Sequence, residues 1–191
     1  MSRLPRAFFE RPAPDVAREL IGKVLVHRTA QGIRSGRIVE VEAYRGRHDP
    51  ASHAYRGPTP RSAVMFARPG HLYVYFTYGM HHCANLVCEP EGRAGAVLIR
   101  ALEPLRGLDA MRRSRGTPEF ARLARGPGCV AQALALDLRH DGIDLSRGEV
   151  WVAGTARAPY AARTLRGPRI GIRVAVERRW RFWVAGHPCV S

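Results

Sequence analysis

Strand-like segments lie in adjacent groups on both sides of one helix-rich block, and this order constrains the fold more than any other feature. Eight segments show the apolar runs or polar–apolar alternation of β-strands: residues 23–28, 36–44, 72–78, 84–88, 96–102, 149–153, 169–176 and 181–185. The block at residues 107–136 is helix-like in pieces, broken at Thr117-Pro118 and at Gly126-Pro127-Gly128. Grouped strands favour antiparallel pairing, so we predict an α+β fold with a largely antiparallel sheet.

Length and composition indicate a single domain. The chain has 191 residues, 46% of them hydrophobic, which suffices for one full core. It contains neither an internal repeat nor a clean linker. No apolar run approaches the roughly 20 residues of a membrane-spanning helix, and the N-terminal residues lack the apolar stretch of a secretion signal. We therefore expect a soluble, cytoplasmic protein without membrane contact.

The charge of the chain favours a polyanionic partner. Lysine and arginine total 31 against 16 acidic residues, a formal net charge of +15, and Lys23 is the single lysine. Nucleic acid is the first candidate for a partner of such a protein. The alternatives are a basic surface that binds nothing and a ribosome-associated fragment. The arginines form no long low-complexity tail, so the charge is expected on a folded body.

The spacing of the cysteines and histidines does not favour a metal site. The four cysteines form no Cys-x-x-Cys pair, and the consecutive residues His81, His82 and Cys83 could place at most two side chains on one ion in a regular strand. His48 or His53 could join them only through an unknown fold. Gly-x-Ser-x-Gly and Gly-x-x-x-x-Gly-Lys-Ser/Thr motifs are absent, and no cofactor is expected.

Two glutamates and one arginine occur in otherwise apolar strands. Glu40 and Glu42 lie in "RIVEVEAY", and Arg100 lies in "AVLIRALEP". A buried carboxylate costs several kcal/mol unless it is paired, so the glutamates are either ion-pair partners of arginines or, for one of them, a general base beside a cleft. Spacing alone does not decide between these readings. A carboxylate, a guanidinium and nearby tyrosines suit the binding of a flat, partly cationic ring; the tyrosines are Tyr44, Tyr73, Tyr75 and Tyr78.

Four segments together resemble the alkyladenine (3-methyladenine) DNA glycosylases, a family distinct from the helix-hairpin-helix glycosylases. They are "GRIVEVEAYRGRHDPASHA", "TPRSAVMFARPGHLYVYFTYGMHHCANLVC", "AVLIRALEPLRG" and "GPGCVAQALAL". The resemblance runs from about Phe8 to Ser191. It implies one DNA glycosylase domain over residues 1–191, built on a curved, mostly antiparallel sheet flanked by helices. It also implies a monomer acting on duplex DNA, associated with the nucleoid in a bacterium or nuclear in a eukaryote.

The resemblance implies two catalytic residues. Glu42 matches the general base that activates a water for attack on the sugar C1′, and Arg100 matches the arginine that helps position that water. The substrate implied is duplex DNA with an alkylated or deaminated purine, such as 3-methyladenine or hypoxanthine. The single lysine lies outside the matched blocks, so a monofunctional enzyme that does not cut the strand is expected.

The resemblance also implies how the base is held. Tyr44, His53 and Tyr75 match the pocket that stacks on the extruded base, and Asn85 matches the asparagine that rejects the 2-amino group of guanine. Tyr78 matches the side chain that wedges into the duplex, with Met80 nearby. His81, His82 and Cys83 are then expected to be scaffold or DNA-facing polar residues.

Some positions depart from the family pattern. Cys129 follows "GPG" where relatives often carry lysine, Ser62 stands where asparagine or threonine is commoner, and His81-His82 replaces bulkier aromatic residues. These departures bear on base preference and on one phosphate contact. Two other functions stay open, a non-catalytic nucleic-acid-binding module of the same fold and a metal-dependent hydrolase.

Overall fold

The computed structural model describes residues 2–154, 160 and 163–191. Over these residues it contains four α-helices and eight β-strands. The helices are α1 (Arg6–Phe9), α2 (Ala13–Leu20), α3 (Leu108–Arg115) and α4 (Pro127–Leu134). The strands are β1 (Val24–Thr29), β2 (Gly32–Tyr44), β3 (Leu72–Thr77), β4 (His81–Val87), β5 (Ala96–Arg106), β6 (Val150–Ala153), β7 (Thr164–Gly167) and β8 (Arg181–Val184).

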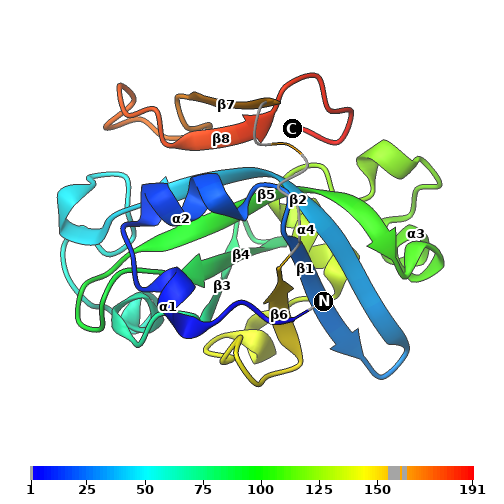
Figure 1. Ribbon diagram of the computed structural model, residues 1–191, viewed down its shortest axis with the longest axis horizontal. Coiled ribbons are helices and arrows are strands. Elements are labelled where there is room, and N and C mark those ends of the chain that lie inside the picture. Colours follow the sequence, from blue (N-terminus) through cyan, green and yellow to red (C-terminus); the bar gives the residue numbers. More distant parts are fainter. Residues whose placement is uncertain (1, 155–159, 161–162) are drawn as a thin grey trace.

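All eight strands belong to one antiparallel sheet. Six follow the order β3-β4-β5-β2-β1-β6, and the hairpin β7–β8 joins through β8 to β2. The long strand β2 makes this branching possible, because its first half pairs with β1 and its second half, at residues 40–42, pairs with β8. The hairpin β7–β8 therefore runs along the top of the sheet in Figure 1. The predicted α+β fold with a curved antiparallel sheet is confirmed.

Helices α3 and α4 lie within the block predicted to be helix-like, residues 107–136, whereas α1 was not predicted. Helix α2 carries a proline in its first turn, buries Ala13, Val16 and Leu20 on one side, and is followed by Gly22 at φ +86°. It packs on β2 and β5, and helix α4 packs on β4 and β5. Pro127 opens α4, so the predicted break at this position is the start of a helix. None of the helices in the described part of the chain is long and apolar enough to cross a membrane.

One predicted strand is wrong. Residues 169–176, all of them described, form bends and turns, and the strand of this region is β7. The backbone has φ +75° at Gly171 and φ +51° at Ala175, which an extended strand does not allow. Arg169 also turns its side chain into the protein, where it is 5% exposed. The alternation in "RIGIRVAV" therefore reflects an irregular segment that folds over the sheet.

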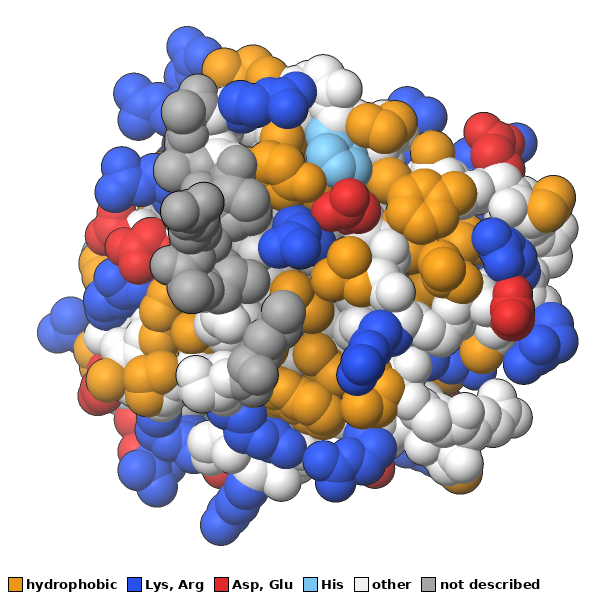
Figure 2. Space-filling model, turned by 45° about the vertical axis from the view of Figure 1, so that its right-hand side comes forward, with side chains coloured by type: hydrophobic (Ala, Val, Ile, Leu, Met, Phe, Trp, Pro, Cys, Tyr) orange, Lys and Arg blue, Asp and Glu red, His pale blue; other side chains and the backbone are white. Residues whose placement is uncertain are grey.

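Basic side chains are distributed over the surface. Figure 2 shows arginine and lysine side chains around the whole visible face, with fewer acidic ones between them. The net charge of +15 thus covers a folded body, as the sequence predicts.

Candidate active site

A cavity of about 390 Å³ opens between β2, β3, β4, β5 and the irregular segment that follows β7. Seven of the eight residues predicted for the site line it: Glu42, Tyr44, His53, Tyr75, Tyr78, Asn85 and Arg100. Met80 is not among the described residues that line it; it lies in the β3–β4 turn and is 69% exposed. Residues far apart in the sequence therefore converge on one hollow.

Glu42 is buried beneath this cavity and is held by three donors. Its Oε1 accepts a hydrogen bond from the Ile170 backbone N–H at 2.7 Å, and its Oε2 accepts one from the Tyr44 hydroxyl at 2.8 Å. Arg100 Nη1 lies 3.3 Å from Oε1. The side chain is fully buried and yet lines the cavity. A carboxylate fixed in this way can accept a proton from a molecule in the cavity without reorientation.

Glu40 lies two residues away and is entirely occupied by structural contacts. Arg100 Nε and Arg181 Nε donate to its Oε1 at 3.0 and 2.6 Å. The backbone N–H and hydroxyl of Ser191 donate to its Oε2, each at 2.7 Å. Glu40 is absent from the described lining of the cavity. The question that the sequence left open thus has a different answer for each glutamate: Glu40 is an ion-pair partner, whereas Glu42 faces a cleft.

An irregularity in the sheet lets Arg100 reach both carboxylates. Across β2 and β5, Glu40 pairs with Ala101 but Val41 pairs with Ile99, so Arg100 has no partner of its own. Such a bulge redirects the side chain of the extra residue. The guanidinium lies between the two glutamates, 10% exposed, and closes one side of the cavity.

Aromatic side chains form the walls of the cavity. The rings of His53 and Tyr75 meet edge-to-face at 4.6 Å, and those of Tyr73 and Tyr75 lie 5.3 Å apart. His53 Nδ1 is 3.0 Å from the Tyr73 hydroxyl. Arg61 lies outside this wall, 4.9 Å from the centroid of the Tyr75 ring. Aromatic faces and edges arranged in this way can enclose a planar ring.

Burial keeps these polar aromatic groups neutral. It raises the pKa of Tyr44 and of Tyr75, and the neighbouring Glu42 and Cys83 add to the respective shifts. Burial likewise raises the pKa of Tyr73 to about 12. Burial, and secondarily the charge of Arg61, lowers the pKa of His53 below its ordinary value. The tyrosines are therefore hydrogen-bond donors at neutral pH and His53 is an uncharged imidazole.

Asn85 and Cys83 lie on the cavity side of β4. They pair across to Tyr73 and Tyr75 of β3, respectively. The Asn85 amide donates to the Tyr73 carbonyl at 3.1 Å, which turns its own oxygen away from that strand. The prediction of Cys83 as scaffold missed that it lines the cavity. Its strand register opposite Tyr75 was the signal that could have revealed this, because directly paired residues share a face of the sheet.

The β3–β4 turn presents one aromatic side chain to solvent. Tyr78 is 85% exposed at the rim of the cavity. Its backbone has φ +52°, a conformation that few residues other than glycine adopt readily. Gly79 follows at φ +67°. Exposure of a large ring on a tight turn has no packing explanation, so it favours a role in contact with another molecule.

The histidines and cysteines of β4 form no metal cluster with the other described residues. The one group of three suitable side chains that the described residues offer is His27, His140 and Glu149, away from the cavity. There His27 Nδ1 lies 2.7 Å from the Leu134 carbonyl oxygen, and His140 Nδ1 accepts from the Asp137 N–H at 3.1 Å. The first contact joins β1 to the end of α4, and the second closes the turn from Asp137 to His140, so both imidazoles are explained as part of the fold.

Packing accounts for one of the departures from the family pattern, Ser62, and nothing in the structure explains Cys129. Ser62 is fully buried, and its hydroxyl accepts from the Thr59 N–H at 3.0 Å, which closes the turn before Ala63. Cys129 lies in the first turn of α4 and is partly buried. Lys23 lies between α2 and β1, and it is not among the described residues lining the cavity.

The chain is thus a basic α+β domain with a carboxylate and a guanidinium in the lining of an aromatic cavity. The model of the methylpurine-DNA glycosylase family matches residues 7–188. This chain belongs to that family. The resemblance seen in the sequence is thereby confirmed.

Several relatives match along almost their whole length. A protein of Burkholderia lata is 53% identical over 98% of this chain and 90% of its own length. Proteins of Streptomyces avermitilis and Chlorobaculum tepidum are 48% and 45% identical, with 98% and 100% of this chain covered and 90% and 91% of their own lengths. All three are named as 3-methyladenine DNA glycosylases.

Proposed function

We propose that residues 1–191 form a single DNA glycosylase domain that releases 3-methyladenine and related damaged purines from duplex DNA. The observation that carries this proposal is the buried Glu42 carboxylate in the lining of an aromatic cavity. Two hydrogen bonds, from Ile170 and Tyr44, and an ion pair with Arg100 hold it in place. Family membership and the names of the relatives support the same activity. The other features of the site agree with it, as the following steps argue.

Glu42 acts as the general base in this proposal. Its carboxylate takes a proton from a water molecule while the water oxygen forms a bond to C1′ of the sugar. The bond between C1′ and the purine nitrogen breaks, its electron pair leaves with the base, and an abasic site remains. Arg100, which lies beside Glu42, helps to orient the water.

The cavity favours a cationic purine. An N-alkylated purine carries positive charge, which aromatic faces attract by cation–π interaction. The same charge makes the base a good leaving group, so no strong acid is required. The neutral imidazole of His53 adds no repulsive charge. Hypoxanthine, which is neutral, would need hydrogen bonding or protonation as it leaves.

In this proposal Tyr78, at the rim of the cavity, assists the extrusion of the base from the duplex, and Asn85, on β4, discriminates between bases. An enzyme that acts on a base inside a duplex must extrude it, which costs a few kcal/mol. Tyr78, exposed at the rim, fills the space that the base leaves, with Met80 beside it on the same turn. Asn85 lies in the lining, where its side chain would meet the 2-amino group of guanine. The surface arginines bind the phosphates, so binding weakens with salt.

The test compares base release by the wild type and by Glu42→Gln. We expect wild-type protein to release 3-methyladenine from duplex DNA, and the variant to lose about 10²–10⁴-fold in single-turnover rate. Glu19→Gln is the matched control, because Glu19 forms an exposed ion pair with Arg11 far from this chemistry. Activity that survives in Glu42→Gln would remove Glu42 from the mechanism.

A non-catalytic nucleic-acid-binding module of the same fold is the alternative, favoured only by the basic surface. It predicts salt-dependent binding with equal affinity for damaged and intact duplexes and no base release. We further propose that the enzyme is monofunctional and monomeric. The first property is supported by the position of the single amine side chain, Lys23, outside the described cavity lining. Efficient borohydride trapping of the protein on its DNA would contradict the monofunctional mechanism. Elution as a dimer in size-exclusion chromatography would contradict the monomeric state.

A further inference from the structure

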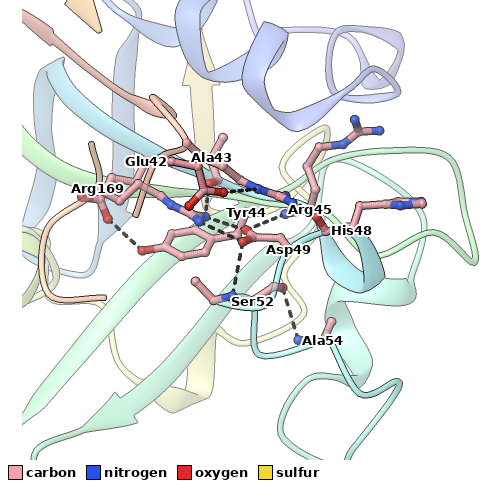
Figure 3. A network of polar contacts seen from close by, with 12 residues as sticks. Glu42, Ala43, Tyr44, Arg45, His48, Asp49, Ser52, Ala54 and Arg169 are labelled. Atoms are coloured by element: carbon pink, nitrogen blue, oxygen red, sulfur yellow. Dashed lines mark hydrogen bonds and ion pairs between the residues drawn. The ribbon is translucent and has the colours of Figure 1, made fainter. Parts of the chain in front are cut away.

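A buried ion pair lies directly behind the proposed catalytic base. Arg169 Nη1 and Nη2 donate to the two carboxylate oxygens of Asp49 at 2.5 and 2.8 Å, and both side chains are completely buried. Arg169 Nη1 also donates to the Ala43 carbonyl at 2.9 Å. Figure 3 shows these bonds meeting next to Glu42 and Tyr44. The pair joins two segments that are 120 positions apart.

Asp49 anchors the pair to the loop after β2. Its Oδ2 accepts the backbone N–H of Arg45 and its Oδ1 that of Ala51, each at 3.2 Å. This loop carries Ala51 and His53 into the cavity lining. The carboxylate therefore sits on a backbone position that several bonds define, and it can serve as a fixed point for the guanidinium.

Arg169 connects this fixed point to two of the three groups that hold Glu42. The next residue, Ile170, donates its backbone N–H to Glu42 Oε1 at 2.7 Å. The guanidinium carbon also lies 4.6 Å from the centroid of the Tyr44 ring, whose hydroxyl donates to Glu42 Oε2 at 2.8 Å. Ile170 is not placed by regular structure, because residues 169–172 are bends or irregular chain, whereas Tyr44 is the last residue of β2.

We propose that Arg169 and Asp49 are positioning residues that hold the Ile170 amide and the Tyr44 hydroxyl on the Glu42 carboxylate. The inference rests on the proposed function for the role of Glu42. Arg169 is not among the described residues that line the cavity, so it acts through its neighbours. Without the pair, residues 170–172 lose their attachment to the loop at Asp49, and the carboxylate loses two directed donors. A misplacement of about 1 Å at a reacting group can cost about 10²-fold in rate.

Asp49 has a second effect on the aromatic wall. It neutralises the guanidinium that stacks on Tyr44, so the ring offers a cationic base no net positive charge from behind. Asp49→Asn keeps the volume of the side chain but leaves this charge unpaired. Release of a cationic purine is then expected to fall more than release of neutral hypoxanthine.

The first experiment measures hydrogen exchange, which is independent of base release. In Arg169→Met we expect the peptide that contains residues 168–173 to exchange at least tenfold faster than in the wild type. Arg34→Met is the matched control, because Arg34 is also buried but bonds to Ser114, Ala133 and Gln31, away from the cavity. Unchanged exchange in Arg169→Met, with Arg34→Met as reference, would overturn the proposal. If Arg169→Met does not fold, Asp49→Asn replaces it in the same comparison.

The second experiment separates rate from affinity. Arg169→Met is expected to lose about 10²-fold in single-turnover release while its affinity for duplex DNA with an abasic site stays within twofold. Arg169→Lys keeps the charge without the paired donors and is expected to recover part of the rate. Equal losses of rate and affinity would show a merely structural role. If the wild type releases no base at all, the proposed function fails, and the exchange experiment still decides whether the pair positions this segment.

Discussion

Replacement of Glu40 by glutamine tests whether the buried charge cluster holds the sheet together. The carboxylate receives four donors, two on each oxygen, from Arg100, Arg181 and Ser191. An amide has one acceptor oxygen, so at least two of the four donors meet an NH₂ group in either orientation of the glutamine. The two guanidiniums, 10% and 15% exposed, also lose their shared negative charge.

The expected cost follows from these contacts. A hydrogen bond to a charged group contributes about 1.5–3 kcal/mol, and two are lost. In other proteins, removal of one partner from a buried ion pair costs about 3–5 kcal/mol of stability. The first route gives about 3–6 kcal/mol and the second about 3–5 kcal/mol, so we expect Glu40→Gln to lose about 3–5 kcal/mol in the free energy of unfolding. This is a large share of the about 5–15 kcal/mol that a domain has in total.

Urea unfolding measures this loss. With a slope of about 2 kcal/mol per M, the midpoint falls by roughly 1.5–2.5 M, and the slope itself is unchanged. Glu19→Gln is the control, since its partner Arg11 lies 3.0 Å away and both side chains are at least 36% exposed. That variant is expected to lose less than about 1 kcal/mol. Equal midpoints for the two variants would refute the assignment of Glu40 to stability.

Three further outcomes are expected. Tyr78→Ala should slow base release yet change stability by no more than about 0.5 kcal/mol, because the ring is 85% exposed; a lower melting temperature with unchanged activity would contradict this. Asn85→Ala should raise the release of guanine relative to hypoxanthine, and a panel of duplexes with single modified bases measures the ratio. The free energy of unfolding should fall as the pH drops below about 6.5, because burial lowers the pKa of three histidines in the folded protein and the unfolded chain therefore binds protons more readily. Each proton taken up on unfolding contributes a slope of about 1.4 kcal/mol per pH unit. Equal urea midpoints at pH 7.5 and 5.5 would refute this expectation. These histidines are His27, His53 and His187.

The sequence could predict the side chains of the site where a polar residue interrupts an apolar strand. Glu42 and Arg100 are conspicuous for this reason, since a charge in such a strand requires a partner or a function. The family resemblance assigned Tyr75 to the base pocket, and the structure places it in the cavity wall. Family resemblance separated Glu42 from Glu40, whereas spacing alone did not. Only the donors around each carboxylate show why the two differ.

Other parts of the site were invisible to pattern analysis. Ile170 contributes its backbone N–H to Glu42, and every residue except proline has that group. Arg169 and Asp49 are 120 positions apart, so no local spacing connects them. The segment around them alternates like a strand, but positive φ angles and the buried guanidinium exclude one. Contacts across the fold determined this region, and local preference did not.

The arrangement of charge is compatible with both the basic surface of the protein and the cationic purine proposed as its ligand. The surface excess of arginine attracts phosphates, but by itself it would repel a positively charged base. Inside, the charges are balanced: Glu40 and Glu42 face Arg100 and Arg181. The Asp49–Arg169 pair behind the aromatic wall is neutral as well. In the proposed function, a cationic purine in the cavity therefore meets aromatic faces and the Glu42 carboxylate. The bulge lets Arg100 reach both glutamates, and of these two carboxylates Glu42, not Glu40, is in the described lining of the cavity.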